Sequence, residues 1–365
     1  MREYLLVFAV AMAVTYLATP LVRAVAVLAG AFTPLRDRDV HTVPMPRLGG
    51  VGILLGFAAA TVVARELPYL SGVYASGQMS GVLIGAAIIC AVGAADDIWG
   101  LDWVTKLAGQ ILAAGVMAYR GVMMLSVPVF GTSTVLPGPV LVTVTIVVVL
   151  VTVNAVNWID GLDGLAAGIC AIAAGAFFAY SYVLSRGYNP ANVFSTSTFV
   201  TAAVLGCCLG FLPHNFNPAR LFMGDSGAML LGLLLAAATV SLTGNVDPTE
   251  VSGDQVTAAL LPLAAPLAVL SLPLLDVVLA VVRRTLAGQR PWEADSLHLH
   301  HRMLHIGHGH RGAVLILYLW ATVLAAGTVS LSFYRGWATL LVLGAAVAVA
   351  AVLTVWLPRW TTKRL

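Results

Sequence analysis

The sequence predicts an all-α integral membrane protein, a polytopic bundle of about eleven transmembrane helices that forms one domain over residues 1–365. The first observation is composition: 60% of the residues are hydrophobic and 10% are charged, with a mean hydropathy of +0.94. The second is that apolar runs long enough to cross roughly 30 Å of hydrocarbon recur along the whole chain. Helices are the expected spanning element, because they pair their own backbone polar groups in lipid.

The expected helices are long apolar runs separated by short polar segments. They are expected near residues 4–30, 48–66, 79–95, 104–120, 138–156, 164–184, 196–213, 226–243, 257–282, 312–331 and 337–357. The first run is interpreted as a retained helix, since it is too long for the core of a signal peptide and lacks a convincing cleavage site. Four cysteines fall in apolar runs and are expected to be plain core or lipid-facing residues: Cys90, Cys170, Cys207 and Cys208.

The distribution of basic residues predicts the orientation of the bundle. An odd number of spans places the termini on opposite sides of the membrane. With the N-terminus outside and the C-terminus in the cytoplasm, fourteen Lys and Arg residues fall on the inner side and five on the outer side. The same orientation puts the acids of the polar segments on the inner side. The catalytic segments are therefore expected near residues 31–47, 96–106, 154–164, 214–227 and 283–311.

The ninth span is expected to be kinked, because it contains Pro262, Pro266 and Pro273 before Asp276. Each proline removes a backbone hydrogen bond and tends to bend a helix. A broken helix here could open a lateral groove from the lipid toward the inner face. Ordinary membrane proline is the alternative, and the sequence leaves both open.

Two acidic segments interrupt the apolar pattern in the first half of the chain. Carboxylates beside a hydrocarbon core are costly and are kept where they bind a metal, a charged substrate or protons. The pair Asp96-Asp97 ends the third span, and Lys106, nine residues after Asp97, could neutralise a phosphate. A solvated helix end with Asp102 as a helix cap would also explain that pair.

The second acidic segment, NAVNWIDGLDG, is harder to explain by capping. Asp160 and Asp163 are each followed by glycine, which suits a tight turn that a ligand can approach closely. Asn154 and Asn157 are three residues apart and so share a helix face. One acid would be enough to cap the sixth span, so two acids and two asparagines favour a ligand site.

Two further polar segments complete the pattern. In NFNPARLFMGDSG, Asp225 is an acid flanked by small residues at the start of the eighth span and is also a plausible helix cap, and Asn215 and Arg220 offer an amide and a guanidinium for a nucleotide. In HLHHR, the imidazoles and the arginine suit a diphosphate, whereas zinc is not expected without a nearby cysteine or a zinc-binding helix motif. The residues of that motif expected to bind substrate are His298, His300, His301 and Arg302.

These motifs resemble the polyprenyl-phosphate N-acetylhexosamine-1-phosphate transferase superfamily, of the glycosyltransferase family 4 type. The resemblance covers about the whole chain, from Arg47-Leu48-Gly49-Gly50 to the C-terminal helix. It depends on four motifs in the family's order: DD at 96–97, NxxNxxDGxDG at 154–164, NxxxARLFMGDSG at 215–227 and HLHHR at 298–302. HLHHR and the segment TVPMPRLGG at 42–50 resemble the branch that uses UDP-N-acetylglucosamine more than the muramoyl-pentapeptide branch.

The resemblance implies a role for each site residue. Asp225 would be the principal Mg²⁺ ligand, with Asp97 beside it in the metal network and Asp96 as base or nucleophile. Lys106 would meet the lipid phosphate, and Mn²⁺ could replace Mg²⁺. The remaining catalytic or substrate-binding residues, which would hold the nucleotide sugar, are Asp160, Asp163, Asn154, Asn157, Asn215, Arg220, His298, His300, His301 and Arg302.

The implied activity is transfer of N-acetylglucosamine-1-phosphate from UDP-N-acetylglucosamine to undecaprenyl or decaprenyl phosphate. The products would be polyprenyl-diphospho-N-acetylglucosamine and UMP, at the cytoplasmic face of a bacterial inner membrane. The expected partners are these substrates and membrane lipid, with no nucleic acid, and a homodimer is one option. Two alternatives stay open: another UDP-N-acetyl sugar, including UDP-MurNAc-pentapeptide, and an ion-coupled transporter. Against transport, the chain shows no internal repeat and its acids gather at one face. Single and double displacement are both compatible with the sequence.

Overall fold

The computed structural model describes most of the chain. The residues outside the description are 34–43, 75–76, 125–126, 130–131, 135–136, 189–195, 245–270, 287, 289–302, 304–305, 335 and 362–365. The described elements are α1 (Arg2–Leu28), α2 (Gly49–Arg65), the 3-10 helix η1 (Leu70–Tyr74), α3 (Gln78–Trp99), α4 (Trp103–Tyr119), β1 (Val127–Val129), β2 (Thr132–Thr134), α5 (Gly138–Ile159), α6 (Leu165–Tyr188), α7 (Thr196–Asn215), α8 (Gly224–Gly244), α10 (Ser271–Leu286), α12 (His310–Phe333) and α13 (Trp337–Thr361).

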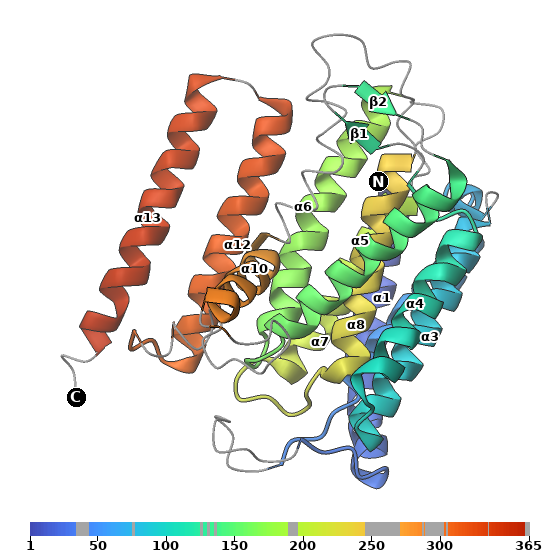
Figure 1. Ribbon diagram of the computed structural model, residues 1–365, viewed down its shortest axis with the longest axis horizontal. Helices are drawn as coiled ribbons and strands as arrows, with labels where there is room; N and C mark the ends of the chain where they lie inside the picture. Colours follow the sequence, from blue (N-terminus) through green and yellow to red (C-terminus); the bar gives the residue numbers. More distant parts are fainter. Residues whose placement is uncertain are drawn as a thin grey trace.

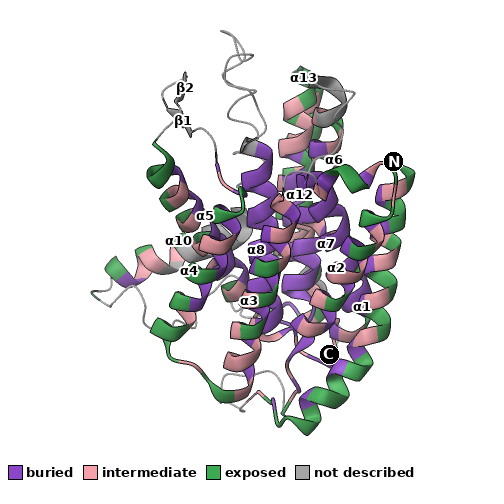
Figure 2. Ribbon diagram, turned by 90° about the vertical axis from the view of Figure 1, so that its right-hand side faces the viewer, coloured by how far each residue is buried: buried purple, intermediate pink, exposed green. Residues whose placement is uncertain are grey.

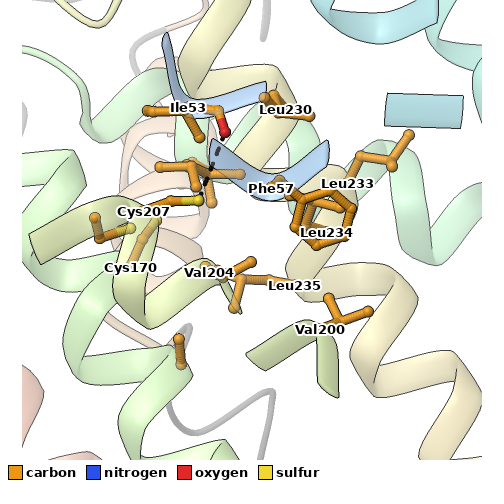
Figure 3. Close-up of a cluster of buried hydrophobic side chains, with 14 of the residues drawn as sticks. Ile53, Phe57, Cys170, Val200, Val204, Cys207, Leu230, Leu233, Leu234 and Leu235 are labelled. Atoms are coloured by element: carbon orange, nitrogen blue, oxygen red, sulfur yellow. Dashed lines mark hydrogen bonds between the residues drawn. The ribbon is translucent and has the colours of Figure 1, made fainter. Parts of the chain in front are cut away.

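Helix α8 is the centre of the bundle and packs against α2, α3, α5 and α7. Its sequence is apolar on every side, as expected of a helix enclosed by other helices. In the most apolar 18-residue window of α8, 94% is buried. Figure 3 shows part of this core, where Leu230 and Leu234 of α8 lie near Phe57 of α2. The four cysteines are buried and free, which confirms their expected place in the core.

The N-terminal turn of α8 and the residues just before it are held by the start of α2 at very short range. The backbone N–H groups of Gly49 and Gly50, at the start of α2, donate to the carbonyls of Phe222 and Met223, each at 3.1 Å. A Cβ atom added at Gly50 would lie 2.2 Å from the Gly227 nitrogen of α8. These contacts fix the segment that leads into Asp225.

Apart from the ninth span, each predicted span coincides with a helix whose bounds differ by a few residues. Eight of the described helices are long and apolar enough to cross a membrane. One shift matters for the site: α3 continues to Trp99, so Asp96 and Asp97 lie in its last turn and not beyond it. The helix ends at Gly100, which has φ 68° and donates its N–H to the Asp96 carbonyl at 2.9 Å.

The ninth span differs from its prediction where it is described. Pro262 and Pro266 lie outside the described residues, so the expected kink and groove are untested. The described half belongs to α10, which begins at Ser271 and runs across the direction of the neighbouring helices (Figures 1 and 2). As described, α10 has 16 residues and carries Arg283 and Arg284 in its last turn, and it is not one of the candidate spans found among the described residues.

The remaining helices complete the bundle. Helices α12 and α13 stand to one side, and the two chain termini lie at opposite ends of the molecule (Figure 1). Helix α13 packs on α12, and only 6% of its most apolar window is buried in the chain. An apolar helix this exposed is suited to face lipid.

Candidate functional site

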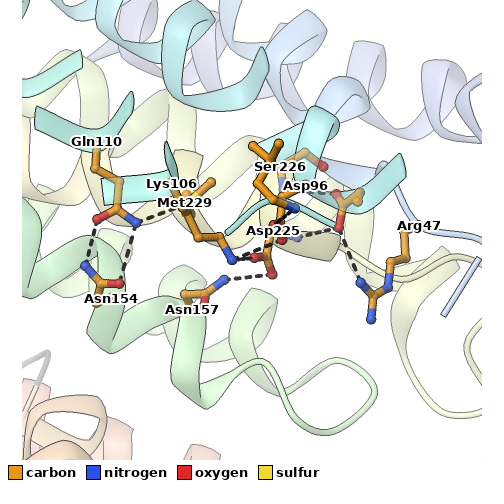
Figure 4. Close-up of polar contacts among 11 residues, drawn as sticks. Arg47, Asp96, Lys106, Gln110, Asn154, Asn157, Asp225, Ser226 and Met229 are labelled. Atoms are coloured by element: carbon orange, nitrogen blue, oxygen red, sulfur yellow. Dashed lines mark hydrogen bonds and ion pairs between the residues drawn. The ribbon is translucent and has the colours of Figure 1, made fainter. Parts of the chain in front are cut away.

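One end of the bundle gathers the acids that the sequence singles out. The last turn of α3, the first turns of α4 and α8, and the last turn of α5 all lie at this end (Figure 1). Their side chains form what we call the charged cluster, drawn in Figure 4. It consists of Arg47, Asp96, Asp97, Lys106, Asn157 and Asp225.

Asp225 is the hub of the charged cluster. Its Oδ1 accepts a hydrogen bond from Asn157 Nδ2 at 3.0 Å, and its Oδ2 contacts the Lys106 ammonium. The side chain keeps 23% of its surface exposed, so solvent and ligands can reach it. Asp225 therefore brings together three of the predicted segments, 96–106, 154–164 and 215–227.

Lys106 joins two carboxylates. Its Nζ lies 3.0 Å from Asp96 Oδ2 and also contacts Asp225 Oδ2. The other oxygen of Asp96, Oδ1, accepts from the N–H of Leu101, just past the end of α3, at 2.9 Å. This hydrogen bond fixes the orientation of the Asp96 carboxylate. Asp102 caps α4 as expected, because its carboxylate accepts from the N–H groups of the first turn.

Asp97 points to a different place than its neighbour. Its Oδ1 accepts from the Asp225 N–H at 2.9 Å and its Oδ2 from the Ser226 N–H at 3.1 Å. These are free N–H groups at the positive end of α8, so Asp97 caps that helix from α3. Its side chain is fully buried. A Cβ atom at Gly224, which has φ 69°, would lie 2.4 Å from the Asp97 carboxylate.

Arg47 is a member of the charged cluster that the site assignment from the sequence omitted. Its Nη1 lies 3.8 Å from Asp97 Oδ1, and its Nε donates to Thr33 Oγ1 at 2.8 Å. The preceding residue, Pro46, accepts from the Phe222 N–H at 2.9 Å, which joins this segment to the one before Asp225. Arg47 belongs to the motif RLGG, whose two glycines allow α2 to pack closely on α8. This position next to a glycine pair is the sequence feature that could have identified Arg47 as a site residue.

Asp160 lies directly after α5 and is partly buried. Burial and the nearby Asp225 and Asp97 carboxylates raise the pKa of Asp160 to about 7, against an opposing effect of Arg47. Within the described part of the chain, no hydrogen bond or ion pair to its carboxylate is found. Asp160 is thus a carboxylate whose charge depends on pH near neutrality.

A second group of polar residues, which we call the turn brace, lies beside the charged cluster. It consists of Asp163, Gly164, Asn215, Asn217 and His310. Asp163 is 3% exposed, and its Oδ2 accepts from Asn217 Nδ2 at 3.0 Å and from the Ala219 N–H at 3.1 Å. Its own N–H donates to His310 Nε2 at 3.1 Å. The brace therefore links the turn after α5 to the segment before α8 and to α12.

Asn215 completes the turn brace from the end of α7. It is 2% exposed, accepts from the Gly164 N–H at 3.1 Å and donates to the Leu221 carbonyl at 3.0 Å. Both ends of its amide are used within the protein. Asn217 and His310 were not identified from the sequence, since their partners are more than fifty residues away and they follow no spacing pattern.

Other predicted residues lie apart from the charged cluster. Asn154 Nδ2 donates to Gln110 Oε1 at 2.8 Å, a pair that bridges α5 and α4 inside the bundle (Figure 4). Arg220 is exposed, and its backbone carbonyl accepts from Arg23 Nε at 3.0 Å. The HLHHR motif lies outside the described residues, as do His298, His300, His301 and Arg302.

The carboxylates of the charged cluster are the described side chains best suited to bind Mg²⁺. Among the described residues, no three His, Cys, Asp or Glu side chains form a ready cage for a metal. Mg²⁺ usually takes one or two carboxylates, several waters and substrate phosphates, and does not need such a cage. Asp225 and Asp96 each have an oxygen on Lys106 Nζ at a partly exposed site and fit that pattern. The sequence pointed to Asp97 as the second ligand, but both oxygens of Asp97 accept from N–H groups of α8.

The chain is similar to known proteins over most of its length. The chain is 43% identical to the decaprenyl-phosphate N-acetylglucosaminephosphotransferase of Mycolicibacterium smegmatis over 97% of this chain and 88% of that protein. A model of glycosyl transferase family 4 matches residues 79–243. The chain belongs to glycosyl transferase family 4. The matched residues run from α3 to α8 and include every acid of the charged cluster.

Two further members of the family are also similar over most of their length. The chain is 31% identical to a probable undecaprenyl-phosphate N-acetylglucosaminyl 1-phosphate transferase of Bacillus subtilis, over 94% of this chain and 89% of that protein. It is 30% identical to the phospho-N-acetylmuramoyl-pentapeptide-transferase of Desulforudis audaxviator, over 82% and 87%. These relatives are bacterial, and the described residues of the chain contain eight candidate spans, so the protein is a multi-pass bacterial membrane protein.

Proposed function

We propose that this protein transfers N-acetylglucosamine-1-phosphate from UDP-N-acetylglucosamine to a polyprenyl phosphate. The products are polyprenyl-diphospho-N-acetylglucosamine and UMP, and the reaction is the first lipid-linked step in the synthesis of an envelope polymer. The observation that carries the proposal is the charged cluster at one end of a membrane bundle, in a chain 43% identical to a decaprenyl-phosphate N-acetylglucosaminephosphotransferase over 97% of its length. Membership of family 4 argues against the ion-coupled transporter.

The chemistry is attack by an oxygen of the lipid phosphate on the β-phosphorus of the UDP-sugar, with departure of UMP. Asp225 and Asp96 would hold Mg²⁺, which offsets charge on the diphosphate and the leaving UMP when it is bound. Lys106 neutralises an incoming phosphate. A lipid phosphate has a second pKa near neutrality, so Asp96 needs to remove at most one proton and mainly orients the nucleophile. We favour single displacement.

Asp97 acts on the reaction through the position of Asp225. Its two carboxylate oxygens hold the Asp225 and Ser226 N–H groups, so it aims the first turn of α8 at the substrates. Asp160 faces the same cluster with a raised pKa and contributes to nucleotide-sugar binding, together with Asn157. His300, His301 and Arg302 of the HLHHR motif bind the diphosphate or the sugar.

The cytoplasm is the proposed location of the site. The charged cluster lies at the same end of the bundle as the last turn of α13 (Figure 1). The positive-inside rule, applied to the Lys and Arg residues of the sequence, makes this the cytoplasmic end. This is also where a nucleotide sugar is available. The lipid phosphate would enter from the inner leaflet.

The branch of the family determines which UDP-sugar is the donor. The name of the 43% relative favours UDP-N-acetylglucosamine and decaprenyl phosphate. The 30% identity to a phospho-N-acetylmuramoyl-pentapeptide-transferase keeps UDP-MurNAc-pentapeptide as the second candidate donor.

The test is UMP release by the purified protein with Mg²⁺, decaprenyl or undecaprenyl phosphate, and a panel of UDP-N-acetyl sugars. UMP from UDP-N-acetylglucosamine alone, abolished by a chelator, is expected. Asp225→Asn should also abolish UMP release. Asp102→Asn is its matched control, because it is a nearby Asp-to-Asn change at an exposed helix cap. UMP from another donor would change the branch, and no UMP from any donor with folded protein would refute the function.

A further inference from the structure

The Lys106 ammonium lies where a metal ion would be expected. Asp96, Asp97 and Asp225 offer six carboxylate oxygens. Four of them hold an N–H donor of the protein: Asp96 Oδ1, both oxygens of Asp97, and Asp225 Oδ1. The other two, Asp96 Oδ2 and Asp225 Oδ2, both contact Lys106 Nζ. The oxygens open to a cation are thus the ones that Lys106 occupies.

The two cations exclude each other at this point. An ammonium and a divalent ion on the same oxygen would lie about 4 Å or less apart, where their repulsion is several kcal/mol at the dielectric of a protein surface. The four N–H donors come from the backbone or from Asn157 in a helix, so they are held in place. Lys106 is 23% exposed and has a long flexible stem, so it is the group able to leave.

We propose that Lys106 occupies the Mg²⁺ position in the metal-free protein, and that metal binding expels its ammonium toward the phosphate of the lipid acceptor. This inference rests on the proposed function for the identity of the metal and the acceptor. Metal binding and presentation of a cation to the acceptor are then one event. The acceptor phosphate in turn stabilises the displaced ammonium, so acceptor and metal each strengthen the binding of the other.

Metal binding without substrate tests the first half of the proposal. The probe is Mn²⁺ alone, followed by electron paramagnetic resonance on the full chain in detergent. Lys106→Met should bind Mn²⁺ at least about tenfold tighter than wild type, because the competing charge is gone. Lys106→Arg keeps the charge and is expected to stay near wild type. Equal or weaker binding by Lys106→Met would overturn the proposal.

A second measurement on the wild type does not depend on the folding of a variant. The chain has two lysines, Lys106 and Lys363. Lysine labelled with ¹³C at Cε therefore gives two side-chain signals, and Lys363 serves as an internal reference. Saturation with Mg²⁺ should shift the Lys106 signal and leave the other in place. A Lys106 signal that stays fixed while Mg²⁺ binds at Asp225 would overturn the exchange.

Decaprenyl phosphate tests the second half. It should tighten Mn²⁺ binding in the wild type by about tenfold and in Lys106→Met much less; equal tightening in both would refute the coupling. Asp225→Asn is the control for the metal assignment, and Mn²⁺ binding equal to wild type in this variant would overturn both that assignment and the exchange. If these binding results are as expected but no donor yields UMP, the proposed function fails and the exchange stands.

Discussion

The charged cluster and the turn brace lie side by side but satisfy their acids in opposite ways. Asp225 contacts an ammonium and an amide and keeps 23% of its side chain exposed. Asp163 is 3% exposed and accepts from an amide and a backbone N–H. The main partner of Asp225 is the flexible Lys106 side chain, which a metal ion can replace. The partners of Asp163 are Asn217 and the Ala219 N–H, which are fixed by the chain and hold the shape of the site.

The difference separates residues that act on substrate from residues that position them. Both groups contain aspartate and asparagine, and both take residues from the same two motifs, NAVNWIDGLDG and NFNPARLFMGDSG. Composition of a motif therefore does not assign a role; exposure and the kind of partner do.

Asp225→Asn should abolish transfer, with a loss of at least about 100-fold, because the hub of the charged cluster loses its charge. The melting temperature should change little, since an amide can still accept from Asn157. UMP release and thermal unfolding on the same preparation measure both. Near-normal activity would remove Asp225 as the metal ligand.

Asp163→Ala should instead destabilise the fold, by about 1–3 kcal/mol, because it leaves the half-buried Asn217 side chain and Ala219 N–H without the acceptor they share. Thermal unfolding measures the loss. Asp163→Asn is the matched variant and should lose less, since its amide oxygen can replace one acceptor. If Asp163 instead takes part in catalysis, as the family resemblance implies, Asp163→Asn will lose activity at an unchanged melting temperature.

His301→Ala tests whether the HLHHR motif works with the charged cluster. The apparent KM for UDP-N-acetylglucosamine should rise by about tenfold, as expected for one lost hydrogen bond to a charged group. The KM for the lipid should change far less. Steady-state kinetics with each substrate varied in turn separates the two. A change confined to the lipid KM would assign the motif to the acceptor.

Asp160 should make the stability of the metal-free protein depend on pH. Its folded pKa is about 7, whereas an ordinary aspartate titrates near pH 4 in the unfolded chain. The folded state therefore holds an extra proton between these values. The contribution of Asp160 to stability should be greatest near pH 4, fall as pH rises to about 7 and level off above it. Thermal unfolding in chelator should show a fall over this range in the wild type and a smaller fall in Asp160→Asn.

The positions of the helices could be predicted because long apolar runs leave few other choices in a membrane. The gathering of Asp96, Lys106, Asn157 and Asp225 also followed, since polar segments at helix ends on one side must lie at one face. The ninth span could not be predicted as well, because prolines and a polar end make its direction depend on its neighbours.

The roles within the site needed the structure. Asp96 and Asp97 are adjacent in sequence, but neighbouring residues of a helix point about 100° apart. One therefore meets Lys106 and the other caps α8, and no spacing rule says which. Arg47 and His310 reach the site from segments distant in sequence, and Asn154 pairs with Gln110 because a buried amide requires a partner.

The close approach of α2 to α8 has a consequence for genetics. Gly50 bears no group that could bind substrate, yet a single methyl there would meet the backbone of Gly227, two residues after Asp225. Gly93 is in the same position on α3, where an added methyl would lie 2.5 Å from the backbone of Ser226. Alleles that replace either glycine should therefore behave like active-site mutants. A selection for lost activity would recover them beside the aspartates.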